Sequence, residues 1–141
     1  MKKKILVMGL PGAGKTTFTK RLVVTCPRHI DAYNGNVIRE YYDDWDFSNE
    51  GRLRQARRMR LMADICIEKL DYDCVCDFVC PTQQLRDIFA PDILVWIDTI
   101  KESKYADTNA LFEPPVKYDY RITDYVRYDY TILQILNTLL L

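Results

Sequence analysis

Short apolar runs alternate with amphipathic stretches along this chain. The runs at 4–8, 29–33, 73–79, 93–97 and 118–122 predict five strands. Two of them, 73–79 and 93–97, are apolar at nearly every position, which is typical of parallel strands that helices cover on both faces.

Between the apolar runs, spacings of three and four residues predict helices at 16–25, 83–89 and 128–140. The longest predicted helix runs from a capping signal at Ser48 or Asn49 to about residue 70. The segment 34–36 reads as a turn. Strands that alternate with helices in this order predict an α/β fold, a mostly parallel central sheet with helices on both faces.

Composition bounds the class of protein. With 141 residues the chain is long enough for one core, so we expect a single domain over 1–141. Twenty basic and 20 acidic side chains give zero net charge, so no global field attracts nucleic acid or membranes. The apolar run near the start is too short for a signal peptide or a membrane span, so we expect a cytoplasmic protein. Five cysteines, an odd number, predict buried free thiols.

The stretch GLPGAGKT at 9–16 fits the phosphate-loop (P-loop) pattern G-x-x-x-x-G-K-[ST] at every position, between an apolar strand and a helix. Small residues let backbone N–H groups wrap a phosphate closely, Lys15 would reach the β and γ phosphates of ATP, and Thr16 would hold Mg²⁺. A glycine turn that merely joins a strand to a helix is the alternative. The expected triphosphate-binding residues are Gly9, Pro11, Gly12, Ala13, Gly14, Lys15, Thr16 and Thr17.

Three further features favour a kinase over a switch or a motor. The chain is too short for a motor's extra domains, it has no NKxD guanine-reading box, and it has an arginine cluster that could bind an anionic acceptor. Alternatively, the cluster is a solvated face or pairs with Asp43, Asp44 and Asp46. Its members are Arg39, Arg52, Arg54, Arg57, Arg58 and Arg60.

Four segments carry a family resemblance. They are GLPGAGKTT at 9–17, NGNVIR at 34–39, DFSNEGR at 46–52 and FVCP at 78–81. In order and spacing they resemble GLSGSGKST, D-G-D-N-V-R, G-F-S-x-x-x-R and F-I-S-P of the adenylylsulfate kinases, which phosphorylate the 3′-hydroxyl of adenosine 5′-phosphosulfate with ATP and magnesium. The resemblance implies a P-loop NTPase fold and a small, anionic, nucleotide-like acceptor.

The same resemblance implies an acceptor site. Arg39 and Arg52 would hold the sulfate or phosphate, and Phe47 would stack on the base, although an ordinary core aromatic is an equal alternative for Phe47. Gln55 falls where the family has an asparagine that contacts the nucleotide. Val79 and Cys80 fall where acceptor-binding residues lie.

The chain departs from the family at two positions, because both aspartates of D-G-D are asparagines here, Asn34 and Asn36. An amide cannot take a proton from a hydroxyl. Asp77, inside an otherwise apolar strand, is the replacement carboxylate that we expect to serve as magnesium partner or base, and an ion pair with an arginine is its alternative. Asp31 and Asp98 are weaker candidates. The expected catalytic set is therefore Lys15, Asp77 and Asn36, with Mg²⁺ at Thr16 and Asp77.

The polar segment 101–117 has the composition of a surface loop and is expected to close over ATP. Arg121 or Arg127 could then reach the triphosphate, although a solvated surface role is an equal alternative. Nearby tyrosines could stack on bases, although packing against the sheet is the more common role at this spacing. The helix at 128–140 is expected to cover the core rather than form a dimer contact.

Together these features predict an ATP-dependent phosphotransferase of the adenylylsulfate kinase type. Two alternatives remain open: a kinase acting on a hydroxyl of a polynucleotide or modified base, and a nucleotide-binding protein that has lost catalysis. Binding to nucleic acid is possible but not favoured.

Overall fold

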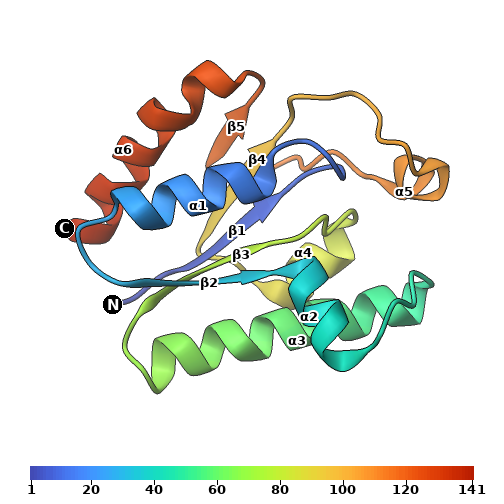
Figure 1. Cartoon of the computed structure of the whole chain (residues 1–141), viewed down its shortest axis with the longest axis horizontal. Helices are drawn as coiled ribbons and strands as arrows, with labels where there is room; N and C mark the ends of the chain where they lie inside the picture. The colour runs from blue at the N-terminus through green and yellow to red at the C-terminus, as the bar shows by residue number, and fades with distance from the viewer.

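A five-stranded sheet lies at the centre of the computed structural model, which describes all 141 residues (Figure 1). The strands are β1 (Lys4–Met8), β2 (Ile30–Asn34), β3 (Asp73–Asp77), β4 (Ile93–Ile97) and β5 (Tyr120–Ile122). Their spatial order is β2-β3-β1-β4-β5, and every neighbouring pair is parallel. All five carboxyl ends therefore meet at one edge, where ligands of such folds bind.

Helices cover both faces of this sheet. The helices of the chain are α1 (Lys15–Thr25), α2 (Gly35–Tyr42), α3 (Asn49–Glu68), α4 (Gln83–Phe89), α5 (Ala106–Leu111) and α6 (Tyr128–Leu140), with a 3₁₀ turn η1 (Tyr125–Arg127) before α6, and α5 lies away from the sheet (Figure 1). In Figure 1, α1 and α6 lie on one face and α3 and α4 on the other. Phe18 of α1 and Ile132 of α6 share one core, and Met59 of α3 and Phe89 of α4 share the second. The predicted α/β architecture is confirmed.

The turn predicted at 34–36 is wrong, because helix α2 begins there. The Asn34 side-chain oxygen accepts hydrogen bonds from the backbone N–H groups of Asn36, at 2.9 Å, and Val37, at 3.2 Å. Asn34 is thus the N-cap of a helix. Asparagine followed by glycine is a turn signal in sequence, but here the amide satisfies the first free donors of a helix. A short helix, α5, likewise lies within the loop predicted at 101–117.

Two strands are shorter than predicted. β3 ends at Asp77 instead of residue 79, because neighbouring β1 has turned into the P-loop and β2 into α2 at the same level. β5 begins at Tyr120 instead of residue 118, since the carboxylate of Asp119 takes the Leu94 N–H at 2.7 Å that a strand carbonyl would otherwise accept.

Two other predictions from composition can be compared with the structure. All five cysteines are buried and free, as predicted. None of the helices combines the length and apolarity needed to cross a membrane.

Candidate active site

The P-loop joins β1 to α1 at the carboxyl edge of the sheet. A Cβ at Gly9 would lie 2.4 Å from the Ile97 carbonyl oxygen, so the loop can begin this close to β4 only with glycine. Gly14 has a left-handed φ of +104°, and its carbonyl accepts a hydrogen bond from the Tyr128 hydroxyl at 3.1 Å. The loop is therefore supported from below by α6 and held against β4.

One cleft of about 1100 Å³ opens above this loop. That volume is at the upper end for a single small-molecule pocket and gives room for two ligands. Six of the eight expected phosphate-binding residues line it: Pro11, Gly12, Gly14, Lys15, Thr16 and Thr17. Gly9 and Ala13 do not, because Gly9 is buried against Ile97 and Ala13 packs in the core. These two residues shape the loop from beneath.

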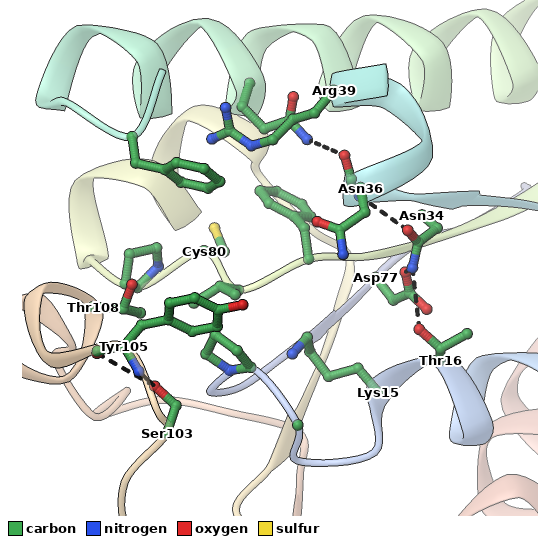
Figure 2. A pocket seen from close by; sticks show the side chains of 18 of the residues that line it. Lys15, Thr16, Asn34, Asn36, Arg39, Asp77, Cys80, Ser103, Tyr105 and Thr108 are labelled. Carbon is green, nitrogen blue, oxygen red and sulfur yellow. Dashed lines mark hydrogen bonds between the residues drawn. The ribbon is translucent and has the colours of Figure 1, made fainter. Parts of the chain in front are cut away.

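Lys15 enters the cleft from the first turn of α1 (Figure 2). Its ammonium group donates a hydrogen bond to the Leu10 carbonyl at 2.9 Å. Burial lowers the pKa of Lys15 to about 8, and the nearby Asp77 carboxylate opposes that shift. A cation held in place at the mouth of a glycine-rich loop is suited to a triphosphate.

Asp77 and Asn34 end the adjacent strands β3 and β2, and they are register partners. The Asn34 amide donates to an Asp77 carboxylate oxygen at 2.7 Å and to the Thr16 hydroxyl at 3.1 Å, as Figure 2 shows. Burial raises the pKa of Asp77, while the hydrogen bond from Asn34 works against it. Asp77 has no ion pair with any arginine, so the structural alternative proposed for it is wrong.

The residues around Asn34 fit a magnesium ion. A hydroxyl and a carboxylate, Thr16 and Asp77, are hard oxygen donors, and one amide holds both. No group of three or more His, Cys, Asp or Glu side chains is arranged to hold a metal. Mg²⁺ usually binds one or two carboxylates together with substrate phosphates, so this small donor set suits it.

The far end of the cleft holds Arg39 and Phe47. Arg39 is buried and donates to the carbonyls of Asp44 and Asp46 at 3.0 and 3.1 Å. Its guanidinium lies 4.2 Å from the ring centroid of Phe47, which is 47% exposed and therefore not part of the core. Burial lowers the pKa of Arg39, so its charge is poorly solvated.

Arg52 and Gln55 of α3 complete this end. Arg52 is buried, lies 5.6 Å from the Phe47 ring centroid and donates to the Thr108 hydroxyl at 3.3 Å. Gln55 donates to the Gly35 carbonyl at 2.8 Å, while its side-chain oxygen is buried without a hydrogen-bond partner. Two buried cations thus lie beside one aromatic ring, and Gln55 adds a buried oxygen without a hydrogen-bond partner to the same cleft.

Val79 and Cys80, which fall where the resembling family has acceptor-binding residues, line the cleft. Cys80 has a left-handed φ of +47°, an uncommon conformation for a residue with a side chain. Its thiol is buried, which raises its pKa, so Cys80 contributes shape rather than a reactive thiolate.

The segment 98–117 covers one side of the cleft. Tyr105, at the start of α5, points into the cleft in Figure 2, and Ser103 and Thr108 also line it. Sequence reasoning identified residues 101–117 of this segment from their polar composition and Tyr105 as one of several tyrosines that could stack on a base, but not Ser103 or Thr108. Trp45 lines the cleft as well and was also missed, since no motif marks it.

Several other candidates lie outside the cleft. Asp31 contacts His29 and accepts a hydrogen bond from Cys66, because it sits near the amino end of β2. Asp98 pairs with Arg121 at 2.6 Å, and neither residue lines the cleft. Arg127 stacks near Tyr130 instead.

The arginines of the cluster differ in their partners. Arg39 and Arg52 line the cleft, whereas Arg54 and Arg58 pair with Asp44 at 3.0 and 2.6 Å. The pairing alternative is therefore correct for this second pair, and Arg60 pairs with Asp64.

Comparison with known families decides which family this fold and cleft represent. The family model described as adenylylsulphate kinase matches residues 1–98. The chain belongs to the adenylylsulphate kinase family. No curated protein sequence matches the chain.

Solved structures of P-loop kinases share the fold. An adenylylsulphate kinase from Mycobacterium tuberculosis, in complex with AMPPNP and APS, has a TM-score of 0.79 at 17% identity, covering 96% of each chain. A sugar kinase from Janibacter sp. HTCC2649 has a TM-score of 0.73 at 14% identity, covering 99% of this chain and 95% of its own. A gluconokinase from Sinorhizobium meliloti 1021 has a TM-score of 0.67 at 12% identity, covering 97% and 93%. The chain thus has the fold of a P-loop kinase.

Proposed function

We propose that this adenylylsulphate kinase family member transfers the γ-phosphate of ATP to a hydroxyl of a small, anionic, nucleotide-like acceptor. The observation that carries the proposal is the cleft itself. It brings a complete P-loop, with Lys15, to one end and two buried arginines around an exposed aromatic ring to the other, with the Asp77 carboxylate lining the space they share.

The donor end would bind the triphosphate. Backbone N–H groups of the loop and the N-terminus of α1 are directed at anions, and Lys15 would neutralise charge as the phosphoryl group moves. Bound Mg²⁺ would supply charge neutralisation at the phosphate oxygens, and Thr16 and Asp77 are the residues that would hold it. Pro11, Gly12, Gly14 and Thr17 would shape the phosphate cradle, with Gly9 and Ala13 supporting it.

The acceptor end would bind the second nucleotide. Arg39 and Arg52 would hold its anion, since each guanidinium is buried and gains from a negative partner. Phe47 would stack on its base, with Val79 and Cys80 as the wall. The partnerless oxygen of Gln55 would accept a hydrogen bond from a hydroxyl or amino group of the acceptor.

The reacting hydroxyl would lie between the two ends. Asn36 lines this part of the cleft (Figure 2) and would orient the hydroxyl, although its amide cannot take the proton. Asp77 is the candidate base for this proton, as the alternative to its role as magnesium partner. Phosphoryl transfer depends mainly on positioning and charge stabilisation, so one weak base is compatible with turnover.

The test is ATP consumption with Mg²⁺, with and without adenosine 5′-phosphosulfate. We expect acceptor-dependent turnover that falls at least ~100-fold in Lys15→Ala, because charge stabilisation by a single preorganised group is worth that much. Lys20→Ala is the matched control, since Lys20 is an exposed lysine on the same helix. Turnover that persists in Lys15→Ala contradicts the assignment of the P-loop.

The same assay separates the alternatives. Turnover with other nucleotides but not with adenosine 5′-phosphosulfate keeps the kinase and changes the acceptor. Turnover with oligonucleotides, with binding that weakens steeply as salt rises, favours the polynucleotide kinase. ATP binding without turnover on any acceptor identifies a nucleotide-binding protein that has lost catalysis.

A further inference from the structure

The Asn34 side chain makes four hydrogen bonds with a fixed direction. Its oxygen accepts from the backbone N–H groups of Asn36 and Val37, which caps α2. Its amide nitrogen donates to Asp77 and Thr16, at 2.7 and 3.1 Å. Since the Asn34 side-chain oxygen caps α2, the Asn34 amide nitrogen must face the oxygens of Asp77 and Thr16.

A second negative charge at position 34, beside Asp77, would destabilise the site. A carboxylate at position 34 would keep the shape and the cap, but it would bring two carboxylate oxygens to the distance of a hydrogen bond with no proton donor between them. Two like charges that share a site at this distance repel strongly. The site therefore accommodates one carboxylate and one amide.

We propose that Asn34 is a positioning residue that directs Asp77 and Thr16 toward the magnesium-bound phosphates. Asn34 and Asp77 form one functional unit, in which the carboxylate stands on β3 and the amide that holds it stands on β2. This proposal rests on the proposed function. The Asp77 carboxylate and the Asn34 amide that holds it stand opposite each other in register, at the ends of neighbouring strands.

An exchange experiment tests the unit. Asn34→Asp and Asp77→Asn are made singly and together, so that the double variant has the same two groups in reversed places. Unfolding by urea in EDTA needs neither metal nor substrate. We expect Asn34→Asp to raise the unfolding equilibrium constant at least ~10-fold through carboxylate repulsion and the double variant to recover most of that loss.

A second measurement separates positioning from a purely structural role. The affinity for ADP is measured with Mg²⁺ and with EDTA. We expect the wild-type protein to bind Mg²⁺-ADP more tightly, Asp77→Asn to lose that gain, and the double variant to regain it. Asn34→Ser keeps an oxygen that can cap α2 but removes the amide donor, so it should reduce the magnesium-dependent gain while the chain stays folded.

Two results would overturn the proposal. One is a double variant no better than the worse single variant in both measurements, because Asn34 and Asp77 then act independently. The other is Asn34→Asp as stable as wild type in EDTA, because the two groups then do not face each other. Neither measurement requires turnover, so a protein that binds nucleotide but transfers no phosphate would refute the proposed kinase activity without deciding the role of Asn34.

Discussion

Two glycines of the P-loop differ in what surrounds them, although both have left-handed φ angles. A Cβ at Gly14 would lie 2.6 Å from the Tyr128 hydroxyl and 2.9 Å from the Tyr125 ring, whereas a Cβ at Gly12 would meet nothing within 4 Å. We expect Gly12→Ala to lose about 1–2 kcal/mol of unfolding free energy from backbone strain. Gly14→Ala should lose clearly more, since Tyr128 must also move.

Urea unfolding of both variants measures this difference. Tyr125→Ala combined with Gly14→Ala should recover part of the loss, because one of the two clashing rings is removed. Equal losses at Gly12 and Gly14 would show that Tyr128 and Tyr125 yield freely, and that φ alone explains the choice of glycine.

For single residues, sequence predicted some positions in the cleft and missed some contacts, for a physical reason. Lys15 and Thr16 could be predicted to lie there because the P-loop pattern is continuous in sequence. Asp77 could be predicted because a carboxylate in an apolar strand is costly to bury without a function. The hydrogen bonds of Asn34 could not be predicted, since its partner Asp77 is 43 residues away and only the register of β2 and β3 brings the two residues together.

The junction of α2 and α3 is held by charge, and this makes it sensitive to acid. Asp44 accepts hydrogen bonds from Arg54 and Arg58, which keep its pKa far below the ordinary value. Bonds from Ser48 and Arg54 lower the pKa of Asp46 to about 2. A carboxylate with a lowered folded pKa stabilises the protein above its unfolded pKa, and that stabilisation is lost as pH falls toward the folded value.

We therefore expect Asp44→Asn to lower the thermal midpoint at about pH 5 and above, and the difference from wild type to shrink as pH falls from about 4 toward 2. Asp43→Asn is the matched control, because Asp43 forms no ion pair and asparagine tolerates its left-handed φ of +50°. A difference between Asp44→Asn and wild type that is constant over this range contradicts the ion-pair explanation.

Sequence predicted the long helix α3 and its start at Ser48 but not α2 or α5. α3 has 20 residues of apolar periodicity and a capping serine, so its signal is local. α2 has 8 residues and α5 has 6, too few for periodicity to exceed chance, and α2 begins with a glycine and an asparagine. Such short helices are stabilised by contacts that the sequence does not display.

Across the whole molecule, a single buried arginine joins the wall of the cleft to the segment that covers it. Arg86 of α4 is 1% exposed and donates to the carbonyls of Cys80 and Pro81, both at 3.1 Å, and to that of Glu113. The Glu113 N–H in turn donates to the Pro81 carbonyl at 2.7 Å. Arg86 is not part of the cleft lining, so its contribution is to hold residues 80–81 and the end of the 98–117 segment together.

Replacing Arg86 should therefore loosen the cover of the cleft. We expect Arg86→Met to lose on the order of 2 kcal/mol or more, because the Cys80 and Glu113 carbonyls lose the guanidinium donor and the Pro81 carbonyl keeps only the Glu113 N–H. Limited trypsin digestion should then cut faster at Lys101, Lys104 or Lys117, which belong to or adjoin this segment. Arg86→Lys should give an intermediate result, since one ammonium group cannot reach three carbonyls as a planar guanidinium does.

Arg60→Met is the control for the loss of an arginine. Arg60 is exposed, with one carboxylate and one carbonyl partner, so its replacement should change the unfolding free energy by no more than about 0.5 kcal/mol. If Arg86→Met unfolds more easily but is digested at the wild-type rate while folded, Arg86 supports only the core. If digestion accelerates at the three lysines under native conditions, the order of the 98–117 segment depends on a residue outside the cleft. The affinity for the acceptor should then also fall, because Thr108, the hydrogen-bond partner of Arg52, lies in the same segment.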